Sequence, residues 1–140
     1  MPALLYLITP LIALLASGLV IAVIRFLDVL ERESWWAIGL CFVIGLMTVI
    51  PAIVICVLAN IVWTALLGDS APLEMLQVTV DAPLIEEAVK GIGVAAAVVL
   101  IRRQIDSLTD YIVYSAVVAI AFEFCENILY LWSRLSMPEG

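Results

Sequence analysis

Charged and strongly polar side chains stand inside two stretches of this 140-residue sequence that are otherwise apolar. They are Glu86, Glu87 and Lys90 in the first stretch, and Glu123, Glu126 and Asn127 in the second. A charged residue at the centre of a membrane helix costs about 2.5–3.5 kcal/mol to insert, and such residues usually face a bundle interior or a wet cavity. These six residues are therefore the candidates for function.

Clustered carboxylates of this kind support two chemistries. One carboxylate can act as a general base while a second holds a proton. Together with an asparagine, the same carboxylates could hold a divalent metal through oxygen ligands, and Glu87 and Glu126 are the candidate ligands. Lys90 could stabilise a developing oxyanion or form an ion pair with a glutamate.

A purely structural interpretation of these residues stays open. Glu86 and Glu87 suit the N-terminus of a helix that has Pro83 in its first turn, with Lys90 as their neutralising partner. Glu123 could extend toward the membrane surface. We favour function, because ionisable residues inside membrane helices are functional candidates by default.

The composition indicates a membrane protein. Hydrophobic residues make up 66% of the chain and charged residues 14%, whereas soluble domains have about 45–50% and about 25%. The 13 acidic residues outnumber the 6 basic ones, which argues against binding to nucleic acid. Histidine is absent, so sites that need an imidazole are excluded unless another chain supplies it.

We predict an all-α integral membrane bundle of about four transmembrane helices, forming a single domain over residues 1–140. The predicted spans are residues 4–27, 35–67, 82–101 and 111–132. The first span is predicted to be retained, because it lacks the basic start of a secretory signal. Residues 68–81 combine Gly, Pro and Ser with three acids, and we expect an external or interfacial loop there.

The second predicted span is unusually long. The uncharged run 34–68 has 35 residues, which as one helix would extend about 50 Å. We predict a single tilted helix that is kinked at Pro51, with Trp35, Trp36 and Trp63 as interface anchors. The alternative is a re-entrant pair of half-helices broken at Pro51.

The last two spans are predicted to form an antiparallel hairpin that turns near Ile105. Glu87 lies 18 residues before this position and Glu123 lies 18 residues after it. The charged side chains of the two spans can therefore meet in one layer, which we expect near the outer membrane face.

Arginine predicts the orientation. Alternating spans place Arg32 on the same side as Arg102 and Arg103, which the positive-inside tendency assigns to the cytoplasm. Both termini are then outside, and Arg134 is a mild exception. The cysteines are Cys41, Cys56 and Cys125, which lie in apolar runs without CxxC spacing and are predicted to pack as small hydrophobic residues.

Three short motifs carry a resemblance to a known family. They are an EExxK motif over residues 86–90 that follows Ala-Pro, a DxxVY motif over 110–114, and an FxxxEN motif over 122–127. Over about residues 82–130 the sequence resembles the PrsW-type intramembrane proteases, relatives of the CAAX-processing proteases.

The resemblance implies a multi-pass endopeptidase of the prokaryotic plasma membrane that cuts membrane-tethered proteins, such as anti-sigma factors, near the outer face. It implies that Glu86 or Glu87 activates the water, that Lys90 supports the pair, and that Glu126 and Asn127 complete the site. The family is metal-dependent or glutamic-type, and its further, histidine-bearing motif has no counterpart in this sequence. We therefore expect either the N-terminal piece of a longer enzyme or a shortened relative that is inactive by itself.

Two other functions remain open. A non-catalytic accessory or assembly subunit of a larger membrane complex would explain the missing histidine and the long apolar spans, which need partners. A small transporter could instead use the carboxylates as a relay. The expected partners are the lipid bilayer and either a membrane-tethered substrate or other membrane subunits.

Overall fold

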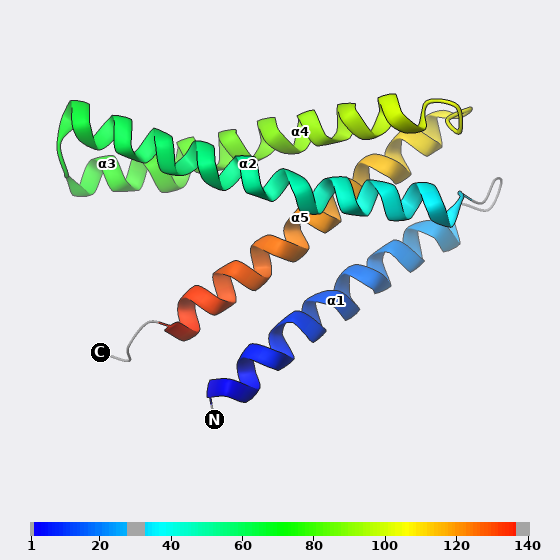
Figure 1. The fold of residues 1–140 in the computed structure, drawn as a ribbon, viewed down its shortest axis with the longest axis horizontal. Helices are drawn as coiled ribbons and strands as arrows, with labels where there is room; N and C mark the ends of the chain where they lie inside the picture. Colours follow the sequence, from blue (N-terminus) through cyan, green and yellow to red (C-terminus); the bar gives the residue numbers. More distant parts are fainter. Residues whose placement is uncertain (1, 28–32, 137–140) are drawn as a thin grey trace.

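The apolar runs of the sequence form helices in a computed structural model that describes residues 2–27 and 33–136 (Figure 1). The elements are α1 (Pro2–Leu27), α2 (Trp35–Leu67), α3 (Ala71–Leu76), the π-helical turn η1 (Gln77–Asp81), α4 (Ala82–Ile101) and α5 (Leu108–Ser136). These described residues contain no strand, which confirms the prediction of an all-α fold.

Helix α2 is one continuous helix from Trp35 to Leu67, with Pro51 inside it. Its bounds agree with the predicted second span. The chain does not turn back at Pro51, so the alternative of two re-entrant half-helices is wrong. The kink at Pro51 stays a prediction.

The predicted loop over residues 68–81 is wrong, because the chain is helical again from Ala71. The turn is confined to residues 68–70, where Gly68 adopts a φ of +73° and donates its N–H to the Thr64 carbonyl. Pro72 then occupies the first helical turn, where its missing N–H costs nothing. No Gly or Pro follows until Pro83, so the helix continues through η1 into α4.

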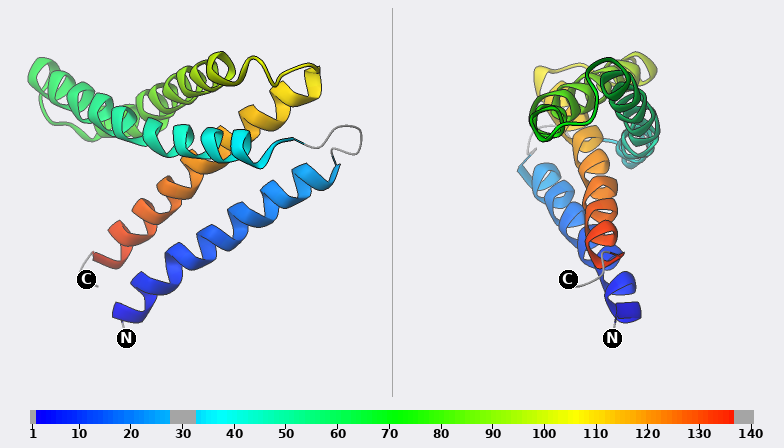
Figure 2. Two further views of the ribbon diagram at one scale, coloured as in Figure 1. Left: turned by 45° about the vertical axis from the view of Figure 1, so that its right-hand side comes forward. Right: turned by 90° about the vertical axis from the view of Figure 1, so that its left-hand side faces the viewer.

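Helices α2 and α4 lie side by side with opposite directions, and α5 packs against both (Figures 1 and 2). Helix α1 packs along α5, and the rings of Tyr6 and Trp132 lie 6.3 Å apart where α1 begins and α5 ends. The start of α2 and the connection 102–107 lie at the opposite end. Arg32 and the side chain of Arg134 fall outside the described residues, so the predicted orientation stays a prediction.

Two buried clusters hold the bundle together. The larger one consists of Ala37, Ile38, Cys41, Ala97, Ile101, Tyr114, Val117 and Val118, and the smaller one of Val49, Ala52, Val89 and Phe122. Gly45 and Gly93 permit the closest helix contacts, because a Cβ at Gly45 would overlap the Val118 carbonyl and one at Gly93 would overlap Thr48. Close packing at small residues is typical of membrane helices.

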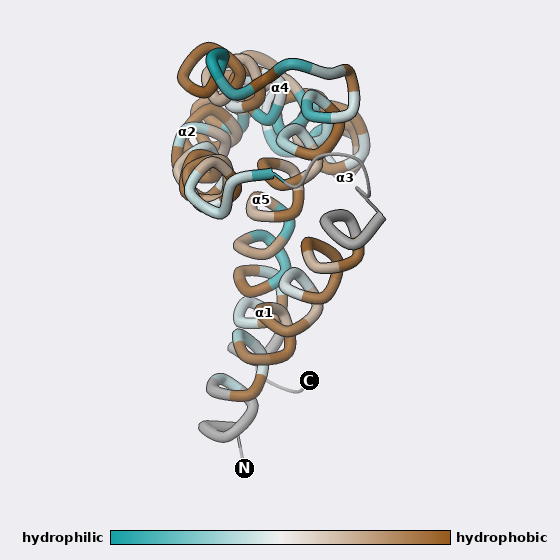
Figure 3. Tube along the Cα trace, turned by 90° about the vertical axis from the view of Figure 1, so that its right-hand side faces the viewer, coloured by the Kyte–Doolittle hydropathy of each residue, from teal (hydrophilic) through white to brown (hydrophobic). Residues whose placement is uncertain are grey.

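The outward surface of the helices is apolar. Residues Trp35–Leu67 and Leu108–Ser133 form helices long and apolar enough to cross a membrane, and only 28% and 33% of their most apolar stretches are buried in the chain. A core helix of a soluble protein would be mostly buried. Figure 3 shows hydrophobic segments along α1 and α2. The chain is therefore a membrane protein, whereas the count of four spans stays a prediction.

Candidate functional site

Lys90 on α4 forms two ion pairs, one within its own helix and one with α5. Its Nζ lies 2.9 Å from Glu87 Oε1 on the same helix and 2.6 Å from Glu123 Oε1 on α5. The same ammonium lies 4.6 Å from the centroid of the Phe122 ring, within the range of a cation–π contact. The Lys90 side chain is 12% exposed, whereas those of Glu87 and Glu123 are 73% and 52% exposed. The lysine is thus enclosed between the helices.

Glu86 faces a different partner from its neighbour Glu87. Together with Glu126, Tyr130, Leu129 and Ser133, it lines a hollow of about 260 Å³. Glu86 and Glu126 are both half-buried, and they line this hollow from α4 and α5. We call these two residues the carboxyl pair.

Apolar neighbours set the register of this polar layer. Val89 precedes Lys90 and Phe122 precedes Glu123, and both apolar side chains are buried in the smaller core cluster. Helical spacing of three residues then places Glu126 one turn beyond Glu123 on the same side of α5. The charged side chains therefore meet because the hydrophobic residues beside them pack together.

The structure brings together four of the five predicted catalytic residues, in two separate groups. Glu87 pairs with Lys90, and Glu86 and Glu126 line the same hollow. Asn127 is exposed on α5 and is not among the residues that line the hollow. Glu123, placed in the layer but not among the predicted catalytic residues, is the partner of Lys90 across the two helices.

The two predicted metal ligands, Glu87 and Glu126, have different neighbours. Across residues 2–27 and 33–136, no group of three or more Cys, Asp or Glu side chains is placed to hold a metal ion. Catalytic zinc sites usually have about three protein ligands. The carboxyl pair supplies two carboxylates, so the side chains described here do not by themselves fit a metal site.

The DxxVY motif has a local explanation that the sequence pattern alone did not reveal. Asp110 accepts hydrogen bonds from the backbone N–H groups of Asp106 and Ser107 and from the Ser107 hydroxyl. The Asp110 N–H in turn donates to the Ser107 hydroxyl oxygen, and this reciprocal arrangement caps α5. The Tyr114 hydroxyl donates a hydrogen bond to the buried carboxylate of Glu33. The motif therefore fastens the start of α5 to the start of α2. The Ser-x-x-Asp spacing was the signal that could have predicted the cap.

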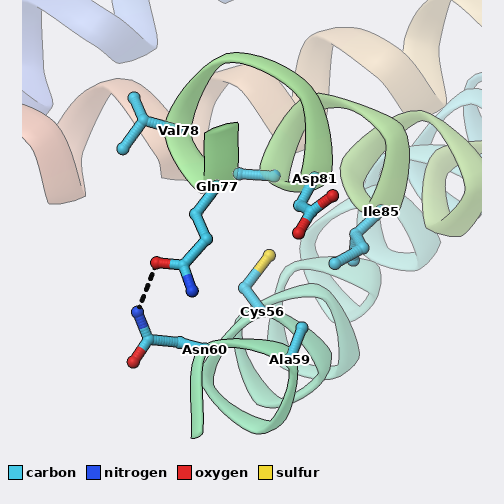
Figure 4. Close-up of a pocket in the computed structure, with 8 residues that line it drawn as sticks. Cys56, Ala59, Asn60, Gln77, Val78, Asp81 and Ile85 are labelled. Atoms are coloured by element: carbon cyan, nitrogen blue, oxygen red, sulfur yellow. Dashed lines mark hydrogen bonds between the residues drawn. The ribbon is translucent and has the colours of Figure 1, made fainter. Parts of the chain in front are cut away.

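The cysteines occupy different surroundings. Cys41 is fully buried in the larger core cluster, and Cys125 packs against the smaller one, as predicted. Cys56 instead lines a pocket between α2 and η1, beside Asn60, Gln77 and Asp81 (Figure 4). The pocket could not be predicted, because residues 77–81 were expected to form a loop.

Long apolar helices with a charged layer where α4 meets α5 define a membrane protein with a polar site between two of its helices. The model of the PrsW family of intramembrane metalloproteases matches residues 33–140, and the chain belongs to this family. The match confirms the resemblance that the motifs carry, and it extends beyond them to include α2. No curated protein and no solved structure matches the chain.

Proposed function

We propose that this chain is a membrane endopeptidase that hydrolyses membrane-tethered proteins at the carboxyl pair. The observation that carries this proposal is the placement of Glu86 and Glu126 from two helices around one hollow, beside a lysine that pairs with two neighbouring carboxylates. Membership of the family supports the reaction class. The same membership does not favour the accessory-subunit alternative.

The two carboxyl groups have complementary roles in the proposed reaction. Glu86 accepts a proton from a water molecule as its oxygen attacks the scissile carbonyl carbon, and Glu126 donates a proton to the amine as the C–N bond breaks. The Tyr130 hydroxyl lines the same hollow and supplies a donor for the developing oxyanion. The pair then returns to its starting state by transfer of one proton from Glu86 to Glu126.

Lys90 and Glu87 have a positioning role in this scheme. Lys90 is held by carboxylates on both helices, so it keeps α4 and α5 at the separation that the carboxyl pair needs. Glu87 contributes one of two ion pairs and is mostly exposed. Its loss leaves Lys90 paired with Glu123.

Cleavage of a single-span, membrane-tethered reporter protein by the full chain in lipid vesicles tests this proposal. We expect Glu86→Gln and Glu126→Gln each to slow cleavage by about 10²-fold or more, the usual contribution of acid–base catalysis. Glu87→Gln should slow cleavage by a smaller factor. Glu74→Gln on exposed α3 is the matched control, because it removes the same charge far from the hollow along the chain, and it should cleave normally.

The unfolding temperature of each variant in detergent separates loss of chemistry from loss of fold. Unchanged cleavage in both the Glu86 and the Glu126 variants would refute the proposed roles. A chain that binds the reporter protein without cleaving it would refute the proposed activity.

A further inference from the structure

A second polar site lies between α2 and the π-helical turn η1. Its polar lining consists of Cys56 and Asn60 from α2 and Gln77 and Asp81 from η1, and Ala59, Ala82 and Ile85 are among its apolar lining (Figure 4). The cavity has a volume of about 180 Å³. We call it the α2–η1 pocket.

The pocket contains one hydrogen-bond donor and one acceptor that have no partner. Among the described residues, Gln77 Nε2 and Asp81 Oδ2 are buried side-chain atoms without a hydrogen bond. The Gln77 amide is oriented by Asn60, whose Nδ2 donates to Gln77 Oε1 at 2.9 Å. Figure 4 shows the Gln77 nitrogen and the Asp81 carboxylate turned toward the space that Cys56 also faces. Buried polar groups without partners are destabilising, so their presence points to a ligand.

The π-helical turn creates this arrangement. Gln77 and Asp81 are its first and last residues, and Pro83 follows directly. A proline ring clashes with the carbonyl four residues earlier in an α-helix, and a wider turn relieves that clash. Isolated π-helical turns occur frequently at functional sites.

We propose that the α2–η1 pocket binds a peptide group of an extended chain segment. The peptide carbonyl accepts a hydrogen bond from Gln77 Nε2, and the peptide N–H donates one to Asp81 Oδ2. A single water molecule needs only about 10–15 Å³, and the larger cavity has room for a peptide group. Ala59 and Ile85 offer an apolar surface to the adjoining side chain. An unwound backbone inside a membrane requires such partners, because lipid supplies none.

The pocket adjoins the carboxyl pair. Ile85 lines the pocket, and the next residue, Glu86, lines the hollow. A segment held in the pocket therefore continues toward the proposed reaction site, and its identity as substrate rests on the proposed function.

Alkylation of Cys56 tests the pocket without any cleavage. The full chain in detergent is treated with N-ethylmaleimide, and the modification rates of Cys56 and Cys125 are measured separately by mass spectrometry. The probes are a capped peptide of alanine and leucine and the oligo-ester of the corresponding hydroxy acids, which keeps the carbonyls and lacks every N–H. We expect the peptide to slow alkylation of Cys56 alone, and the ester to require about tenfold higher concentration, as the loss of one hydrogen bond predicts.

Three variants test whether Gln77 and Asp81 form the proposed hydrogen bonds to the peptide. Gln77→Leu and Asp81→Asn should each weaken protection by the peptide about tenfold. Thr79→Val is the matched control, because Thr79 lies in the same turn but is exposed, and it should leave protection unchanged. Equal protection by the ester and the peptide, no effect of either variant, or equal slowing at Cys125 would overturn the inference.

These experiments distinguish a failure of the proposed function from a failure of the proposed peptide binding in the α2–η1 pocket. Glu86→Gln should retain full protection of Cys56 while it loses cleavage. Protection of Cys56 in a chain whose Glu86→Gln variant still cleaves would refute the proposed function alone. Loss of cleavage in Glu86→Gln without any protection of Cys56 in the unaltered chain would refute the pocket alone.

Discussion

Lys90 on α4 and Glu123 on α5 form an ion pair with an N–O distance of 2.6 Å, across a separation of 33 residues in the chain. The pair joins the two helices that carry the proposed site. The charged layer thus has two parts, the ion pairs of Lys90 with Glu87 and Glu123, and the carboxyl pair of Glu86 and Glu126. The division of roles between Glu86 and Glu87 follows from this contact.

Replacement of Lys90 by methionine is expected to destabilise the chain. The variant keeps the length and the apolar stem of the side chain but removes the charge that binds both carboxylates. Unfolding in detergent should show a loss of about 1–3 kcal/mol, the usual value of a hydrogen bond to a charged group. Cleavage should also fall, because α4 and α5 lose their polar contact.

A double-mutant cycle measures how strongly Lys90 is coupled to each of its two glutamate partners. Coupling of Lys90→Met with Glu123→Gln should exceed its coupling with Glu87→Gln, because only Glu123 lies on the other helix and is the less exposed carboxylate. Equal coupling to both glutamates would contradict the view that Lys90 joins α4 to α5.

Two glycines of α2 should respond oppositely to alanine. A Cβ at Gly45 would overlap the backbone carbonyl of Val118 and the side chain of Ala121, so Gly45→Ala should destabilise by about 1–3 kcal/mol. Nothing lies within 4 Å of a Cβ at Gly39. Gly39→Ala should therefore be neutral or stabilise by up to about 1 kcal/mol. Thermal unfolding in one detergent compares them, and similar losses in both variants would contradict the close α2–α5 contact.

The hydrogen bond from Tyr114 to Glu33 is expected to stabilise the fold. Tyr114→Phe removes one donor from a buried carboxylate, and we expect a loss of about 1–3 kcal/mol in the free energy of unfolding. Tyr111→Phe on the exposed side of the same helix is the control and should change little. A Tyr114→Phe variant as stable as the control would show that this bond does not fasten α5 to α2.

Cysteine labelling in intact cells tests the predicted orientation. Asp69 lies in the turn between α2 and α3, and Gln104 lies between α4 and α5. A membrane-impermeant maleimide should label Asp69→Cys from outside and label Gln104→Cys only after permeabilisation, as the positions of Arg102 and Arg103 predict. The reverse pattern would contradict the orientation, and labelling of both sites from outside would contradict the crossing of α4.

The local features of the chain could be predicted because they depend on near neighbours in the sequence. The second predicted span agrees with α2. Counting residues from the turn of the hairpin placed Lys90 and Glu123 in one layer, and in the structure they form an ion pair. The predicted loop over 68–81 was wrong because Gly, Pro, Ser and three acids indicated an exposed segment, whereas the chain is helical from Ala71 and packs against α2. The residue types alone do not predict which helix will pack against these polar side chains.

The sequence by itself determined that this is an all-α membrane protein with its charge concentrated on two helices, because hydropathy and helical spacing are local properties. Only the tertiary structure decided that Lys90 pairs with Glu123 while Glu86 and Glu126 line one hollow, since the rotation of α4 against α5 depends on how Val89 and Phe122 pack. It also decided that η1 closes a polar pocket against α2. These contacts join residues far apart in the chain, and the packing of whole helices is what brings them together.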